Sequence, residues 1–205
     1  MKRLLGMIVC SVLLLGASAA SAGPLTKQER DALIKELKRT EKLLKDATKG
    51  LTPAQWSYKS AADRWSVQDC LEHLALTEEF LFNRMKDGVL KTPATAPDMT
   101  TAKETDAMIL KVIPDRSNKA VAPEPLRPSG KFKSPQEMLK AFSERRKQTI
   151  EYVKTTQDDL RAHKAPSPLG RDFDGYHWLL LLSAHTERHT SQALEVKGDA
   201  GYPKR

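Results

Sequence analysis

Residues 174–196 read DGYHWLLLLSAHTERHTSQALEV, and their apolar residues recur at helical spacing. At 100° per residue, one sector of such a helix combines apolar residues with two histidines: Trp178, Leu181, Leu182, His185, His189, Gln192 and Val196. The two histidines therefore continue the apolar stripe instead of facing water. We predict that this stretch is the last helix of an all-α bundle and that both imidazoles point into it.

The histidine pair has two interpretations. Because His185 and His189 are four residues apart, their imidazoles leave one helix face a turn apart and can reach one ion. His73, on an earlier helix, could add a third nitrogen and complete a three-histidine site with open coordination positions, as in catalytic metal centres. The spacing alone supports a hydrogen-bonded core pair equally well, since H-x-x-x-H also arises by chance.

The other residues considered for this site are weaker candidates for a functional role. Cys70 is interpreted mainly as a small apolar core residue, with a fourth-ligand role as the minor alternative. Glu187 lies on the helix face opposite the histidines, so it is not the glutamate of a metalloprotease motif, and we assign no catalytic residue. His163 and His177 are interpreted as incidental. We interpret all three tryptophans as core anchors: Trp56, Trp65 and Trp178. Trp178 also shares the histidine sector, so lining a pocket is an alternative role for it.

Apolar periodicity and capping signals predict four long helices, at about residues 27–49, 66–87, 134–155 and 174–197. Ser66 and Asp69 form an S-x-x-D capping pattern at the start of the second helix. Ser134 is followed by Pro135 at the first helical position of the third helix. Between the first two helices, Thr52 caps a short helical turn.

The long segment at residues 88–133 contains six of the twelve prolines, so it cannot be one continuous helix. One short helix is expected within it, at about residues 101–112. A crossover of this length can traverse the domain, which allows the second and third long helices to run parallel. No β alternation or internal repeat competes, so we predict an all-α four-helix bundle with a long proline-rich crossover loop between helices 2 and 3.

The first 22 residues have the pattern of an export signal: Lys2 and Arg3, an apolar run, and Ala20-Ser21-Ala22 as a cleavage site. We therefore expect a signal peptide at residues 1–22, one domain at residues 23–205, and an extracytoplasmic location, periplasmic or secreted. Cys10 lies within the signal, which leaves Cys70 alone and excludes an internal disulfide. No later stretch has the roughly 20 apolar residues of a membrane helix, so stable membrane insertion is not expected.

The charge pattern argues against a nucleic-acid partner. The formal net charge is +8, and it falls to +6 when the two charges of Lys2 and Arg3 are removed. The remaining lysines and arginines alternate with Glu and Asp, which is typical of a solvated helix surface, and no basic stripe interleaved with aromatics is present. We expect a small-molecule substrate and leave a homodimer open.

Three segments together resemble the DinB-like superfamily, also called the DinB/YfiT-like metalloenzymes. Residues 51–80, LTPAQWSYKSAADRWSVQDCLEHLALTEEF, are similar to its tryptophan turn and the helix with its first metal histidine. Residues 174–196 are similar to its last helix with the other two, and residues 126–146, LRPSGKFKSPQEMLKAFSERR, to its loop and third helix. The resemblance implies an up-down-down-up bundle and a divalent ion, usually zinc or nickel, on His73, His185 and His189.

The resemblance implies two classes of activity. Characterised members of the superfamily include thiol-dependent transferases and isomerases, and many others are described only as metal-dependent hydrolases. The thiol cofactors of the transferases and isomerases are cytosolic, so the export signal disfavours that activity here. Our main hypothesis is an exported metal-dependent hydrolase, because three neutral nitrogens leave positions free for water and substrate. The alternative is an extracytoplasmic helical module that binds a metal or ligand without turnover.

Overall fold

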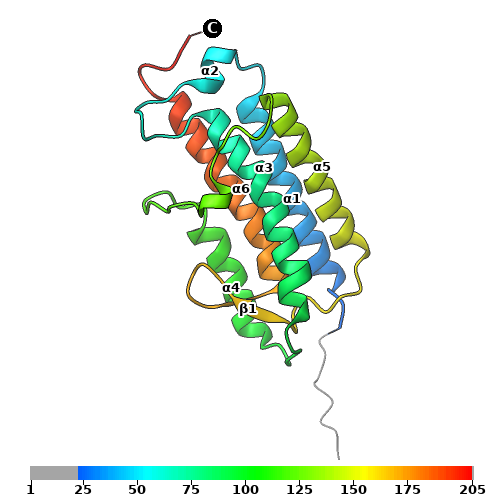
Figure 1. The fold of residues 1–205 in the computed structure, drawn as a ribbon. Helices are drawn as coiled ribbons and strands as arrows, with labels where there is room; N and C mark the ends of the chain where they lie inside the picture. The colour runs from blue at the N-terminus through cyan, green and yellow to red at the C-terminus, as the bar shows by residue number, and fades with distance from the viewer. Residues whose placement is uncertain (1–22, 205) are drawn as a thin grey trace, which may run out of the picture.

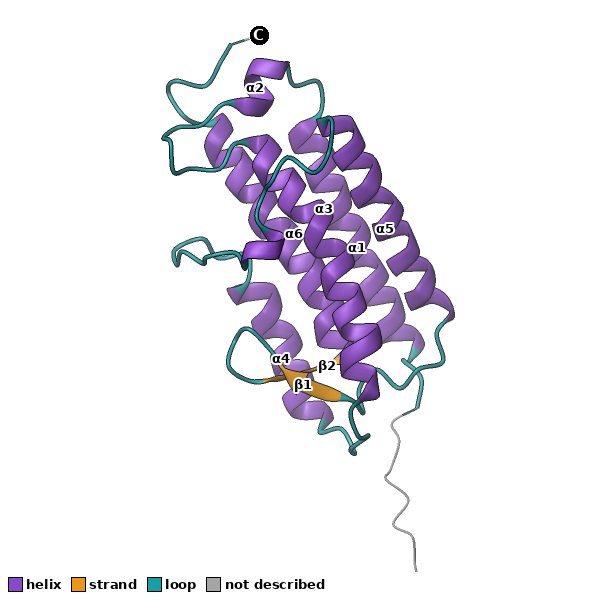
Figure 2. Ribbon diagram, viewed as in Figure 1, coloured by secondary structure: helices purple, strands orange, loops and turns teal. Residues whose placement is uncertain are grey.

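The computed structural model describes residues 23–204, so the predicted signal peptide lies outside the described residues. The helices are α1 (Lys27–Thr48), α2 (Pro53–Ser57), α3 (Val67–Asn83), α4 (Met99–Val112), α5 (Pro135–Thr155) and α6 (Gly175–Lys197). The remaining elements are the short helical turns η1 (Arg84–Gly88), η2 (Val89–Lys91) and η3 (Glu124–Leu126), and the strands β1 (Lys164–Pro166) and β2 (Asp172–Asp174). Figure 2 shows that helices dominate this part of the chain.

The four long helices form the predicted bundle. In Figure 1, α1 runs toward the end that carries α2, α3 and α5 both run away from it, and α6 returns to it, which is the up-down-down-up order. Helix α6 packs against α1 on one side and α3 on the other, and α5 closes the bundle between them. Helix α4, at the predicted position of the short crossover helix, packs against the outside of α6.

Local capping explains where the helices begin. The hydroxyl of Thr52 accepts from the backbone N–H of Gln55, and that of Ser66 accepts from Asp69, so two predicted capping boxes are confirmed. The hydroxyl of Ser134 likewise accepts from the N–H of Glu137 ahead of α5. Each cap satisfies a donor that the helix itself cannot, and the cap of α3 at Ser66 lies only seven residues before His73.

The bundle core is divided into two apolar clusters by a polar layer. One cluster includes Leu37, Leu81 and Ile150, and the other includes Leu44, Leu74 and Phe142. Between these positions along the helices lie polar residues that contact one another: Thr40 on α1, Glu78 on α3, Arg146 on α5, and Ser183 and Thr186 on α6. The histidines of interest lie on the side of this layer that contains Leu74 and Ala193.

Two local features differ from the sequence prediction. The second long helix does not continue as an α-helix to Asp87; it ends at Asn83 and passes into the π-helical turn η1. At its end Gly88 has no Cβ, and the guanidinium of Arg84 lies 3.0 Å from where one would be. The α-helical part of this segment therefore ends at Asn83, and a π-helical turn carries the chain on to Gly88.

Residues 164–174 contain a small antiparallel hairpin, a local addition to the all-α bundle that the sequence prediction did not include. β1 and β2 pair with Ala165 opposite Phe173, and both of these side chains are buried. The connecting turn uses Gly170 at φ +73°, a conformation that glycine adopts readily. Strands of three residues are too short to produce a detectable alternation.

Within residues 23–204, no helix has both the length and the apolar character needed to cross a membrane.

Candidate metal centre

The structure brings the three predicted histidines together. His73 comes from α3, and His185 and His189 come from successive turns of α6. The Nε2 atom of His185 lies 3.2 Å from Nε2 of His73 and 3.1 Å from Nε2 of His189. One ligand atom from each ring lies within 4.8 Å of the others, and this is the one such group found among residues 23–204. The three nitrogens therefore face a common point; their role as metal ligands stays a prediction.

Hydrogen bonds on the far side of two rings determine which nitrogen carries the proton. Nδ1 of His73 lies 2.6 Å from the carbonyl oxygen of Leu126, which can only accept, so this Nδ1 carries hydrogen. Nδ1 of His189 lies 2.9 Å from Oε1 of Gln192. The same amide oxygen accepts from Nη1 of Arg116 at 3.2 Å, so the oxygen of Gln192, and not its N–H₂ group, faces both partners. Nδ1 of His189 therefore also carries hydrogen. In the neutral rings of His73 and His189, Nε2 then has no hydrogen and carries a lone pair.

This proton arrangement fits a shared cation. The two lone pairs of His73 and His189 both point at Nε2 of His185. A neutral His185 ring has at most one hydrogen on that atom and can donate it to only one neighbour. At least one buried lone pair is thus left without a donor, which is costly in the interior. A divalent ion bound by all three nitrogens would satisfy every lone pair, so the donor set fits a metal.

The electrostatic environment keeps the imidazoles neutral. Desolvation of the His185 imidazole among the atoms around the site, reinforced by repulsion between its cationic form and His73 and Arg188, lowers its pKa to about 3. Burial and the other two imidazoles hold the pKa of His189 well below its usual range. Burial also lowers the pKa of His73, although its hydrogen bond to Leu126 opposes this. Neutral imidazole is the form that binds metals, so the site is ready to bind one without first losing protons.

These pKa shifts predict a pH-dependent stability for protein freed of metal by a chelator. The unfolded histidines have pKa values near 6.5, whereas the folded values are lower, so below pH 6.5 the unfolded chain binds protons that the folded protein excludes. The free energy of unfolding should therefore fall on acidification, by up to about 1.4 kcal/mol per pH unit for each histidine.

Urea unfolding between about pH 7 and pH 5 measures this slope, and His189→Gln should flatten it. The prediction is wrong if the free energy of unfolding is constant over that range, or if the variant has the same slope as the unchanged protein.

Access to the site differs among the three rings. The side chains of His73 and His189 are 3% and 8% exposed, whereas His185 is only partly buried. The half-buried Trp65 packs over the site: its ring is stacked on His189 with centroids 5.7 Å apart, and lies 5.0 Å from the ring of His73. The sequence interpretation treated Trp65 only as a core anchor. Its position directly before Ser66, the cap of the helix that carries His73, was the available signal.

Two hydrogen bonds connect Nδ1 of His189 to the crossover segment, and an ion pair joins the same segment to α6. Gln192, which shares the histidine sector of α6, accepts from His189 and from Nη1 of Arg116, and the same guanidinium forms an ion pair with Glu195 at 2.8 Å. Arg116 lies in the crossover just after α4, in a stretch without periodicity. Sequence reasoning had no signal for it, nor for the carbonyl of Leu126.

Several other predicted positions lie elsewhere. Cys70 packs in an apolar cluster, its sulfur is not part of the group of converging donors, and burial raises its pKa to about 12. Glu187 pairs with Arg39 of α1 at 2.6 Å, away from the histidines. Trp178 packs against Phe173 in the other cluster, so it is a core residue.

His177 is not incidental, contrary to the sequence interpretation. It caps α6 together with Asp174 and is buried with Arg161 and Asp106, which lie 3.3 Å and 3.1 Å from its Nε2. Nδ1 of His163 lies 2.6 Å from the carbonyl oxygen of Thr92, and His163 is not one of the three converging histidines. His177 thus joins the start of α6 to α4, and His163 joins the segment before β1 to the residue after η2.

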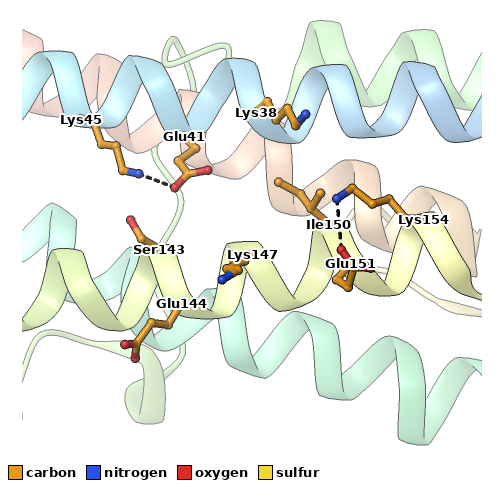
Figure 3. Close-up of a pocket in the computed structure, with 9 residues that line it drawn as sticks. All are labelled: Lys38, Glu41, Lys45, Ser143, Glu144, Lys147, Ile150, Glu151 and Lys154. Atoms are coloured by element: carbon orange, nitrogen blue, oxygen red, sulfur yellow. Dashed lines mark hydrogen bonds and ion pairs between the residues drawn. The ribbon is translucent and has the colours of Figure 1, made fainter.

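A separate groove of about 450 Å³ lies between α1 and α5 (Figure 3). Charged side chains dominate its walls, among them Lys38, Glu41, Lys147 and Glu151, and none of the three converging histidines lines it. Lysine and glutamate alternate there, and Lys45 pairs with Glu41 at 2.6 Å. The groove has the character of a solvated helix surface, and we place no chemistry in it.

Comparisons with known proteins agree with this fold. The sequence profile of the DinB superfamily matches residues 36–193. The uncharacterized protein YuaE of Bacillus subtilis (strain 168) is 27% identical over 149 residues, which cover 73% of this chain and 87% of YuaE. The structure is similar to that of YfiT from Bacillus subtilis, described as a probable metal-dependent hydrolase with an unusual four-helix bundle topology; the TM-score is 0.58 at 18% identity, over 87% of this chain and 91% of YfiT. This chain belongs to the DinB superfamily.

Proposed function

We propose that this protein is an exported, divalent-metal-dependent hydrolase of small molecules, with the metal held by His73, His185 and His189. The observation that carries the proposal is the convergence of three neutral imidazoles, two of them with Nε2 lone pairs aimed at the third. Membership of the DinB superfamily and the description of YfiT as a probable metal-dependent hydrolase support it.

The chemistry follows from the donor set. A divalent ion on three neutral nitrogens acts as a Lewis acid and lowers the pKa of coordinated water toward about 7, which is the basis of metal-assisted hydrolysis. Imidazole nitrogens suit zinc and nickel, which we propose as the ions. No cysteine or carboxylate of residues 23–204 joins the three histidines as a fourth donor, so coordination positions stay free for substrate.

The residues around the ligands have distinct tasks in this proposal. The carbonyl of Leu126 and the amide of Gln192 hold the Nδ1 protons of His73 and His189, which fixes ring orientation and increases ligand basicity. Trp65 stacks on His189, lies tilted against His73, and would limit access of water from that side. A substrate would approach past the more exposed His185.

One observation favours a second candidate, a module that binds a metal or ligand without turnover. Hydrolysis usually requires a group that accepts a proton, yet no Asp or Glu oxygen in the described part of the chain lies among the converging donors. Export, which we propose from the signal-peptide pattern of residues 1–22, applies to both candidates.

Activity of metal-loaded protein separates the two candidates. Untagged protein without residues 1–22, reconstituted with zinc or nickel, is assayed against esters, amides, phosphoesters and thiol conjugates. The hydrolase proposal expects turnover that a chelator removes, that added metal restores, and that His73→Ala lacks. Stoichiometric metal without turnover of any substrate class would favour the binding module, and no metal after reconstitution would contradict both.

A further inference from the structure

Glu72, the residue before His73 on α3, has an unusual set of partners. Its side chain is 2% exposed. Its Oε1 atom accepts from the backbone N–H groups of Ser129 at 3.1 Å and Lys131 at 2.8 Å, and its Oε2 atom accepts from Gly130 at 3.2 Å. Three consecutive N–H groups of the crossover thus surround one buried carboxylate, the arrangement by which backbone donors hold an anion. The bonds join α3 to a segment more than fifty residues away in sequence.

The same segment contacts His73. Leu126, at the end of η3, is buried, and its carbonyl oxygen accepts from Nδ1 of His73 at 2.6 Å. Only Arg127 and Pro128 separate Leu126 from the first residue bonded to Glu72, and the ring of Pro128 restricts its own φ. Glu72 and His73, about 100° apart around α3, therefore hold the segment at residues 126–131 at two adjacent points.

We propose that Glu72 is a positioning residue for the metal centre. Its carboxylate fixes the segment at residues 126–131 so that the Leu126 carbonyl keeps His73 in the Nδ1–H form, with the Nε2 lone pair directed at His185 and His189. The part of this inference that concerns metal affinity rests on the function proposed above. The part that concerns the proton of His73 does not, because it applies to the metal-free protein as well.

Glu72→Gln tests the inference with little change in side-chain shape. In the variant, an N–H₂ group replaces one carboxylate oxygen and faces a backbone N–H that donated to that oxygen in the unchanged protein. Two donors cannot bond each other, so at least one of the three hydrogen bonds is lost. We expect the dissociation constant for Zn²⁺, measured by competition with a chromophoric chelator, to rise about 10- to 100-fold. The matched control is Glu78→Gln, which alters a second buried carboxylate of α3 that bonds Arg146 instead of the crossover. Its Zn²⁺ dissociation constant should stay within about threefold of the unchanged protein.

The protonation of His73 provides a readout that does not involve metal. Two-dimensional ¹H–¹⁵N correlation of the imidazoles distinguishes Nδ1–H from Nε2–H rings. In the metal-free unchanged protein and in Glu78→Gln, His73 should be in the Nδ1–H form. In Glu72→Gln it should become a mixture of both forms. If Glu72→Gln does not fold, Gly130→Ala addresses the same segment from its other side, since Gly130 has φ +74° and donates to Glu72.

The outcomes separate this inference from the proposed function. Unchanged zinc affinity and unchanged His73 protonation in Glu72→Gln would overturn it. Equal losses of affinity in Glu72→Gln and Glu78→Gln would also overturn it, because the cause would then be general destabilisation. If the unchanged protein binds no divalent ion, the proposed function fails, and the protonation of His73 alone decides whether Glu72 positions that ring.

Discussion

His185→Ala should reduce the bound divalent metal from about one equivalent per chain to near zero. The reason is geometric, because Nε2 of His185 is the atom that lies within 3.2 Å of the corresponding nitrogens of both His73 and His189. Without it, two imidazoles on different helices remain, and two neutral nitrogens hold a divalent ion far more weakly than three. Elemental analysis of untagged protein, after reconstitution and removal of free metal, measures the change.

Helical content should be almost unchanged in this variant. Alanine has the highest helix propensity, and His185 is the most exposed of the three rings, so its removal leaves a small cavity at most. Far-UV circular dichroism measures this. The effect must therefore appear in metal content and not in folding.

His163→Ala is the matched control. This partly buried histidine also bonds a backbone carbonyl through Nδ1, at 2.6 Å from the oxygen of Thr92, but it is not one of the converging donors. It should retain about one equivalent of metal. If His185→Ala retains as much metal as His163→Ala, the three-histidine site is wrong.

The parts of this site that follow helical periodicity could be predicted from the sequence. A spacing of four residues places His185 and His189 on one face of α6. The cap at Ser66 determines where the helix that carries His73 begins. The bundle follows for the same reason, since four long amphipathic segments with clear caps have few other ways to bury their apolar faces.

The parts supplied by irregular backbone could not be predicted. Leu126 orients His73 through a main-chain carbonyl, to which any residue type would contribute equally, and Arg116 reaches Gln192 from a turn in the crossover. Neither position has a pattern in the sequence that points to the histidines. The hairpin at residues 164–174 was missed because its strands are too short to alternate.

The buried ion pair between Arg146 and Glu78 was missed although a signal exists. Both residues lie on apolar stripes: Glu78 follows Leu74 by four residues on α3, and Arg146 follows Phe142 by four on α5. Opposite charges at stripe positions of two helices predict that the charges meet inside the bundle, because neither could be buried alone.

The structure shows how completely this pair is satisfied. Arg146 is 0% exposed and Glu78 is 2% exposed, and the guanidinium donates to both carboxylate oxygens, at 2.5 Å and 2.8 Å. Its remaining donors reach the Leu37 carbonyl at 2.7 Å and the hydroxyls of Thr40 and Thr186 at 3.0 Å and 2.8 Å. The guanidinium thus bonds to all three of the other long helices.

Glu78→Ala should therefore lower the free energy of unfolding by about 3–5 kcal/mol, because it leaves a buried guanidinium without its counter-charge. Arg146→Ala should have an effect of the same size, since it leaves a buried carboxylate and opens a cavity. Urea unfolding of chelator-treated protein measures both, so that metal binding does not contribute to the stability. Glu79→Ala is the control: the ion pair of Glu79 with Arg145 lies at the surface, and its loss should cost less than about 1 kcal/mol.

Replacing both charges tests the cause of this loss. If the cost of each single change comes from the unpaired charge, Glu78→Leu combined with Arg146→Met should be far more stable than Glu78→Leu alone or Arg146→Met alone, since an apolar pair of similar volume leaves no charge unmatched. The hydroxyls of Thr40 and Thr186 would still bond the carbonyls of Leu37 and Leu182 in their own helices. Losses that simply add in the double variant would instead mean that each side chain stabilises the bundle by packing alone, and that the polar layer has no electrostatic role.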